Sequence, residues 1–351
     1  MNLIIKNIVV LAGKILFSLK SKTIPKDPKK ILIIRSGGIG DVLMSTPLVK
    51  AIRHNYPKSE ITYFVGNWSK DALKDNPNIN KLYTYDDLII IRMNISGIRK
   101  IIKEMKKEHF DLCFNLEKSW HWGILSYLFK IPTRIGFNRK GEGFAYNLST
   151  PFKGKKYELE YYLDLARLLN LNIPTNKMEV CLTKQELIKA KKYLKGAIGL
   201  APGGADNPAQ QASIKRWPLE NYKQLIQNLP KQKFILFGGK NDLETCNQLQ
   251  TRNTINLAGK LTLKESAAVM KQCKVIITHD AGPMHLAAAS KSHLIALFGP
   301  TQALRFAPRD AITLQTQSKP CYTIYGTFER KDNYMGEIPV EKVLKIIKAF
   351  K

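Results

Sequence analysis

Short apolar runs alternate with amphipathic stretches along most of the chain, and the alternation restarts near its middle. Mostly aliphatic runs of four or five residues are typical of strands buried on both faces, and the stretches between them have helical spacing. The pattern predicts parallel sheets flanked by helices, because parallel strands must be joined by crossovers. The predicted strands are 31–35, 61–65, 81–85, 112–115, 134–137, 197–200, 233–237, 275–278 and 294–298. The predicted helices include 41–55, 98–108, 184–194, 218–228, 242–249, 263–272 and 283–289.

The restart divides the chain into two α/β domains. Residues 170–183 are loop-rich, and 351 residues are enough for two domains of ordinary size. We predict a leader at 1–28, a first domain at 29–180, a second at 181–338 and a final helix at 339–351. Ligands of such folds bind at the carboxyl ends of strands and between domains, so the chemistry is expected in loops that follow strands.

The leader has a helical apolar face and a basic composition. Apolar residues at helical spacing are Ile4, Ile8, Leu11, Ile15 and Leu19, while Lys6 and Lys14 interrupt any run long enough to span a bilayer. No small-residue cleavage site follows cleanly, so a signal peptide is poorly supported. Two alternatives stay open: a helix that lies on an anionic membrane, or one that packs on the protein.

The formal net charge of +28 requires a cause. Nucleic acid, an anionic membrane, an anionic substrate or a lysine-rich genome would each account for it. Aromatic residues are not interleaved with the cations in any nucleic-acid recognition motif, so a nucleic-acid partner is not predicted. The five cysteines are widely spaced without a CxxC pair, which predicts neither a zinc site nor disulfides and fits the reducing cytoplasm.

A glycine-rich turn follows the first predicted strand. Ser36, Gly37, Gly38 and Gly40 let the backbone approach a ligand closely, and Asp41 opens the next helix. The positive end of the helix dipole favours an ionised carboxylate there, so Asp41 is a candidate general base. The structural alternative is that Asp41 serves only as the helix N-cap.

Two further turns follow strands of the second half. Gly203 lies in the first of them, and the cations Lys215 and Arg216 come shortly before a helix that Pro218 begins. The second turn places Asp280 ahead of a helix start, whose free N–H groups suit a pyrophosphate. Thr301 follows the next strand at the same edge. The alternatives are a solvated basic loop and a tight structural turn.

Motifs for other modes of phosphate handling are missing from the sequence. It contains no GxxxxGK[ST] loop, no Asp-x-Asp pair and no histidine spacing typical of a metal site. Neither a metal nor a cofactor is therefore predicted. Protein cations and helix ends must then stabilise a leaving diphosphate.

Taken in order, these segments resemble the heptosyltransferase family, glycosyltransferase family 9. The matching segments are 31–47, 111–112 with 134–137, 160–163, 202–203 with 215–218, 280–289 and 297–301, which together cover roughly residues 30–310. The resemblance implies the GT-B fold, in which two Rossmann-like domains face each other across a cleft and the final helix crosses back to the first domain. It also implies an inverting, metal-independent transfer.

The resemblance further implies roles for individual residues. Asp41 matches the base that deprotonates the acceptor hydroxyl, and Asp280, with Gly203 and Thr301, lines the donor pocket. Ser36, Gly37, Gly38 and Gly40 lie on the acceptor side. The residues that hold the donor diphosphate are Lys215, Ala281, Gly282, Pro283, Met284 and His285.

The implied partners are ADP-heptose and a lipopolysaccharide core or another anionic glycolipid, handled in the cytoplasm at the inner face of the inner membrane. Three alternatives remain from the residues: transfer from another nucleotide-sugar, epimerisation of a nucleotide-sugar, and a basic nucleic-acid- or membrane-binding protein without catalysis.

Overall fold

The computed structural model describes residues 3–17, 23–193, 195–330, 332 and 334–350. They form two compact units. One comprises Met1–Gly37, Met44–Lys70 and Asn76–Lys177, and the other Gly38–Leu43, Asp71–Asp75 and Met178–Lys351. The main division along the chain falls between residues 177 and 178. The exact domain boundaries predicted from the sequence stay predictions. Leu19, which the leader prediction places on the apolar face, lies outside the described residues.

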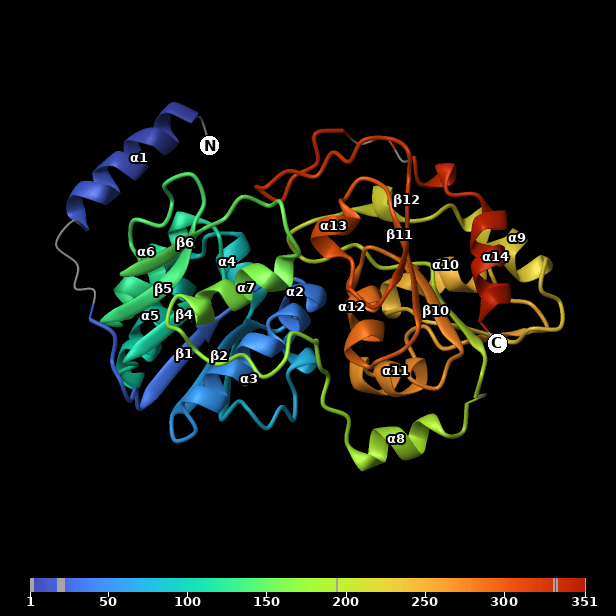
Figure 1. The fold of residues 1–351 in the computed structure, drawn as a ribbon, viewed down its shortest axis with the longest axis horizontal. Helices are drawn as coiled ribbons and strands as arrows, with labels where there is room; N and C mark the ends of the chain where they lie inside the picture. The colour runs from blue at the N-terminus through green and yellow to red at the C-terminus, as the bar shows by residue number, and fades with distance from the viewer. Residues whose placement is uncertain (1–2, 18–22, 194, 331, 333, 351) are drawn as a thin grey trace. The chain divides into compact units, whose positions relative to one another are not determined.

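The first unit is built on a six-stranded parallel sheet of order β3-β2-β1-β4-β5-β6. Helices cover both of its faces (Figure 1). Its strands are β1 (Lys30–Ile34), β2 (Glu60–Gly66), β3 (Lys81–Tyr85), β4 (Leu112–Asn115), β5 (Thr133–Asn138) and β6 (Leu148–Pro151). Helices of the first half of the chain are α1 (Leu3–Leu16), α2 (Ile39–Met44), α3 (Thr46–Asn55), α4 (Asp87–Ile91), α5 (Ile95–Glu108), α6 (Trp120–Leu128) and α7 (Glu158–Arg167), with a 3₁₀ turn η1 (Lys70–Ala72).

Strand β1 lies at the centre of this sheet, and its aliphatic side chains are buried on both faces. Leu32 and Ile34 join the core between the sheet and helices α5 and α6, together with Phe64 and Phe129. Ile31 and Ile33 alternate with them and are equally buried. This two-sided burial is the reason that the strand reads as a continuous apolar run in the sequence.

The second unit repeats the arrangement with a six-stranded parallel sheet of order β12-β11-β10-β7-β8-β9. Its strands are β7 (Ile198–Ala201), β8 (Phe234–Leu236), β9 (Thr254–Asn256), β10 (Val275–His279), β11 (Leu294–Phe298) and β12 (Ile312–Gln315). Its helices are α8 (Lys184–Ala190), α9 (Leu219–Gln227), α10 (Leu243–Asn247), α11 (Leu263–Met270), α12 (Gly282–Ala289), α13 (Ala303–Phe306) and α14 (Val340–Ala349), with 3₁₀ turns η2 (Ser213–Lys215), η3 (Lys240–Asp242) and η4 (Met335–Glu337).

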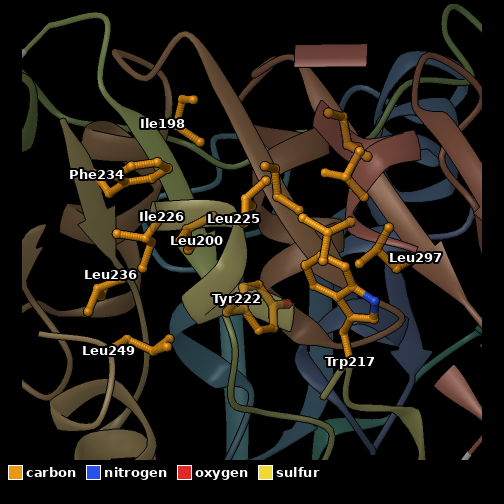
Figure 2. Close-up of a cluster of buried hydrophobic side chains, with 14 of the residues drawn as sticks. Ile198, Leu200, Trp217, Tyr222, Leu225, Ile226, Phe234, Leu236, Leu249 and Leu297 are labelled. Carbon is orange, nitrogen blue, oxygen red and sulfur yellow. The ribbon is translucent and has the colours of Figure 1, made fainter. Parts of the chain in front are cut away.

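Trp217 is the largest fully buried side chain and anchors the core of the second unit (Figure 2). Its ring meets Tyr222 edge to face at 4.9 Å between centroids, and its Nε1 donates to the carbonyl of Ile338 at 2.9 Å. This hydrogen bond ties the residues before α14 to those before α9 and satisfies a polar group that burial would otherwise leave unpaired.

The C-terminal helix α14 packs against α9. Val340, Val343 and Ile347 lie on one side of the helix and belong to the same core as Trp217. These contacts lie within the second unit. The predicted return of this helix to the first domain stays a prediction.

The helix predicted over 41–55 is interrupted. Helix α2 ends at Met44, Ser45 intervenes, and α3 begins at Thr46. Pro47 is the cause, because proline has no N–H to donate to a carbonyl of the preceding turn. The Ser45 hydroxyl instead forms a hydrogen bond with that of Tyr63 at 2.6 Å.

Candidate active site

Both sheets place the candidate loops at the point where their strand order reverses. When the strands of each sheet are counted from β1 or from β7, the order from one edge to the other is 3-2-1-4-5-6. Crossovers leave the central pair in opposite directions, and ligands of open α/β sheets typically bind at such a point, beside the loops after these two strands. The central pairs are β1 with β4 in the first unit and β7 with β10 in the second.

The loop after β7 is held by Asp242 at the end of η3. Its Oδ1 accepts from the backbone N–H of Gly204 at 2.7 Å, and its Oδ2 accepts from that of Gly239 at 2.8 Å. Gly203 lies so close that a Cβ there would come within 2.2 Å of Asp242 Oδ1. A side chain at 203 would displace the carboxylate, so the loop requires glycine at this position.

Lys215 and Asp280 form a largely buried ion pair beside this loop. Lys215 Nζ lies 3.0 Å from Asp280 Oδ2, and His285 Nε2 lies 3.9 Å from Asp280 Oδ1. Burial alone would raise the pKa of Asp280, but Lys215 and His285 outweigh it and hold that pKa below its ordinary range. The aromatic faces of Tyr322 and Phe328 lie 5.7 Å and 6.0 Å from Lys215 Nζ.

Helix α12 begins directly after Asp280 and Ala281. Ala281 has extended backbone geometry and no side chain to cap the helix, and Pro283 occupies the first turn. Unsatisfied N–H groups at such a start attract anions. A cation, a helix start and a glycine loop therefore gather at the carboxyl ends of β7 and β10. Together these groups suit a phosphorylated ligand.

Arg216 and Thr301 flank this cluster. The Arg216 guanidinium donates to the carbonyl of Gly204 at 2.8 Å and 2.9 Å and pairs with Asp206 at 2.6 Å. These contacts stabilise the loop after β7, so Arg216 has a structural role in this loop. Thr301 is fully buried after β11, and its hydroxyl also favours the ionised form of Asp280.

Asp41 is half-buried in the first turn of α2, a segment that belongs to the compact unit of α12. It is the third residue of the helix, so the reading of Asp41 as a helix N-cap is wrong. A Cβ at Gly38 would lie 3.5 Å from Asp41 Oδ2, and one at Gly40 would lie 2.3 Å from His285 Cδ2. Asp41 is thus next in sequence to a residue that touches the α12 turn.

The backbone of the loop after β1 is fixed by a carboxylate from the loop after β4. Glu117 Oε1 accepts from the Ser36 N–H at 2.7 Å, the Ser36 hydroxyl at 2.8 Å and Arg35 at 2.8 Å. Arg35 also donates to the Tyr162 hydroxyl at 3.1 Å. Gly37 follows with φ of +118°, a conformation that favours glycine. The turn is therefore preformed.

Sequence reasoning missed Asp242 and Glu117. Glu117 comes two residues after the predicted strand 112–115, the place where functional loops were expected, so a signal for it was present. Asp242 carried no such signal, because its role depends on the adjacency of β7 and β8. Nearby, Lys118 forms an ion pair with the fully buried Glu158 of α7.

The described residues contain no cluster of three or more His, Cys, Asp or Glu side chains suited to a metal ion. Of the helices in the described part of the chain, none combines the length and apolarity that crossing a bilayer requires.

Comparison with known proteins identifies the family. The profile of glycosyltransferase family 9 (heptosyltransferase) matches residues 98–329. The lipopolysaccharide core heptosyltransferase OpsX of Haemophilus influenzae is 25% identical over 342 residues, which cover 90% of this chain and 95% of that protein.

Two solved structures have the same fold. A glycosyl transferase family 9 protein from Veillonella parvula matches with a TM-score of 0.76 and 23% identity, over 94% of this chain and 99% of that one. The E. coli ADP-heptose lps heptosyltransferase II matches with a TM-score of 0.72 and 23% identity, over 92% and 98%. The predicted GT-B class with two Rossmann-like domains is confirmed. This chain belongs to glycosyltransferase family 9, the heptosyltransferases, and is a glycosyltransferase.

Proposed function

We propose that this enzyme transfers heptose from ADP-heptose onto a lipopolysaccharide core, with inversion at the anomeric carbon and without a metal. The donor and acceptor are those in the names of its relatives OpsX and heptosyltransferase II. Family membership makes epimerisation and a non-catalytic binding role the less favoured alternatives. The single observation that carries the proposal is the Lys215–Asp280 pair beside the start of α12.

In this proposal the second domain binds the donor. Lys215 and the turn 281–285 at the start of α12 hold the diphosphate. Gly282 can donate its backbone N–H there, whereas Pro283 has none. Gly203, Asp280 and Thr301 line the pocket. Asp280 keeps Lys215 oriented, and its ionised form is favoured by the charges around it. As the bond to the sugar breaks, negative charge grows on the leaving diphosphate oxygen. A fixed cation and a helix start stabilise that charge without rearrangement.

The acceptor binds beside Ser36, Gly37, Gly38 and Gly40, and Asp41 acts as the base. Asp41 takes the proton of the acceptor hydroxyl while the oxygen forms its bond to the anomeric carbon. The bond from that carbon to the diphosphate breaks on the opposite face, so the configuration inverts. ADP leaves with the electron pair. The base contributes typically 10²–10⁴-fold to such a reaction.

The proposed location is the cytoplasmic face of the inner membrane, where the protein binds peripherally. The support is the charge of +28 and an acceptor carried on a lipid. The two domains are proposed to face each other across the cleft in which donor and acceptor meet.

The test separates donor binding from chemistry. We expect calorimetry to give ADP binding that persists in EDTA and exceeds that of UDP and GDP. Asp41→Asn should bind ADP as the wild type does, yet release ADP from ADP-heptose in the presence of acceptor at least roughly a hundredfold more slowly. Lys215→Ala should weaken ADP binding, because it removes the cation.

The exposed carboxylate Asp71, changed to Asn, is the matched control and should leave both measurements unchanged. Preference for UDP or GDP would reject heptose as the sugar. Near-normal turnover of Asp41→Asn would remove this residue from the role of base.

A further inference from the structure

Helix α1 presents a continuous apolar face to solvent. Ile8, Leu11, Ile15 and Leu16 are each between 61% and 80% exposed. They recur at the spacing of one helical face, with Ala12 also exposed between them. Soluble proteins rarely leave so many large aliphatic side chains together in water, which makes this face a candidate for contact with a partner.

The other side of α1 is fixed to the first unit. The Gly13 backbone packs so closely on Phe144 that a Cβ would lie 2.5 Å from its ring. Phe17 meets Tyr127 edge to face at 4.8 Å and Phe144 at 5.9 Å between centroids. These contacts decide which side of the helix faces outward. The apolar side chains are therefore exposed although the helix is packed on the protein through its other side.

The exposed apolar surface continues from α1 onto the end of α6. Tyr127, which contacts Phe17, is 49% exposed, and the neighbouring Leu128 is 40% exposed. We refer to the six side chains together as the α1–α6 face: Ile8, Leu11, Ile15, Leu16, Tyr127 and Leu128.

The charge around the α1–α6 face indicates its partner. Helix α1 contains no acidic residue, its Lys14 is exposed, and the exposed Lys130 lies two residues after the end of α6. The first thirty residues carry seven lysines against one acid, Asp27. An apolar face bordered by lysines matches the boundary between acyl chains and anionic headgroups.

The dimensions favour a helix that lies along a bilayer. Fourteen residues span about 21 Å, short of a hydrocarbon core of about 30 Å. The contacts with Phe144 and Tyr127 also leave only one side of the helix available. We propose that the α1–α6 face docks on the surface of an anionic phospholipid bilayer. This inference deepens the peripheral location proposed above.

The test uses the full chain and vesicles of defined composition. Wild-type protein should co-sediment with phosphatidylcholine vesicles that contain one quarter phosphatidylglycerol, and less with phosphatidylcholine alone. The double variant Leu11→Ser, Ile15→Ser should bind the anionic vesicles at least roughly tenfold more weakly, because apolar area drives insertion. Circular dichroism establishes that the variant is folded.

The matched control is Ile188→Ser, Leu304→Ser, which removes two aliphatic side chains of the second unit with exposures of 64% and 73%. It should bind vesicles as the wild type does. Equal loss in the control, or wild-type protein that ignores anionic vesicles, would overturn the proposal. A dimer that only the α1 variant loses, measured by light scattering, would assign the face to a second copy instead.

Transfer to a delipidated, soluble acceptor distinguishes this inference from the proposed chemistry. The α1 variant should keep that activity, since its substitutions lie outside the proposed site. If the α1 variant loses vesicle binding but retains transfer, the result supports membrane docking through the α1–α6 face and says nothing against the proposed reaction. Normal vesicle binding without any transfer in the wild type would instead count against the proposed reaction.

Discussion

Burial has opposite consequences for two neighbouring residues, His279 and Asp280. Asp280 keeps its charge because Lys215 lies 3.0 Å away. Burial lowers the pKa of His279 to about 3, and the positive charges of Lys215 and Arg216 add to the effect. The imidazole of His279 is therefore neutral under ordinary conditions and adds no positive charge beside Lys215.

This predicts a pH dependence of stability. Between pH about 6.5 and about 3 the unfolded chain binds a proton at His279 that the folded chain does not. The free energy of unfolding should then fall by about 1.4 kcal/mol for each pH unit as the pH is lowered through this window. Between pH 6.5 and 5, the free energy of unfolding measured in urea should fall by about 2 kcal/mol less for His279→Gln than for the wild type.

Asp280 does not contribute between pH 6.5 and 5. Its folded pKa is lowered, so its stabilisation is fully present above its unfolded pKa of about 3.9 and is lost as the pH falls from there through the folded value. Between pH 8 and 7.5 the wild type and His279→Gln should change alike. A parallel decline of the two proteins between pH 6.5 and 5 would contradict a neutral, buried His279.

At the scale of elements, the sequence predicted the central strands and missed three at the edges. The missed strands are β6, β9 and β12. Each lies at an edge of its sheet and is only partly buried, so none has the continuous apolar run of a strand covered on both faces. Among the edge strands only β3 was predicted.

The candidate site was predictable to the extent that local sequence determines it. Asp280 and Lys215 follow from residue type and position after a strand, and the structure brings the two side chains together. The position of Glu117 after a predicted strand was a signal, but its partners, and those of Asp242, depend on which strands are neighbours, which a linear pattern does not encode. The leader left two readings open. Helix α1 packs one side on the protein and exposes the other.

Asp242 joins two elements, the loop after β7 and the loop after β8, through the N–H groups of Gly204 and Gly239. Asp242→Ala should lower the free energy of unfolding by about 2 kcal/mol, because two charge-assisted hydrogen bonds are lost from a partly exposed site. It should also weaken ADP binding. Denaturant unfolding and calorimetry measure the two effects.

Asp242→Asn is the comparison variant, since its amide keeps one acceptor oxygen and should give an intermediate loss. If Ala and Asn behaved alike and both matched the wild type, the two loops would be held by other contacts.

At the scale of the whole molecule, each half has a core of its own. The core around Trp217 draws its members from residues 198–347, together with partly buried neighbours such as Phe350. A fragment of residues 178–351 should therefore unfold cooperatively on its own. It contains Lys215 and Asp280, so it should bind ADP, but it lacks Asp41 and should transfer nothing.

Urea unfolding and calorimetry of this fragment test the division. The fragment with Lys215→Ala is the control and should lose ADP binding while keeping its unfolding transition. A fragment without a cooperative transition would mean that the second half depends on the first to fold.

The repeated strand order has a consequence for how such enzymes diversify. In each sheet most of the candidate loops follow the two central strands, whereas the strands themselves and the covering helices carry the packing. A loop can then change length or chemistry while the layers beneath it stay intact. If donor and acceptor bind as proposed, preference for a sugar donor and preference for an acceptor become separately heritable traits, and each can drift or be selected without loss of the other.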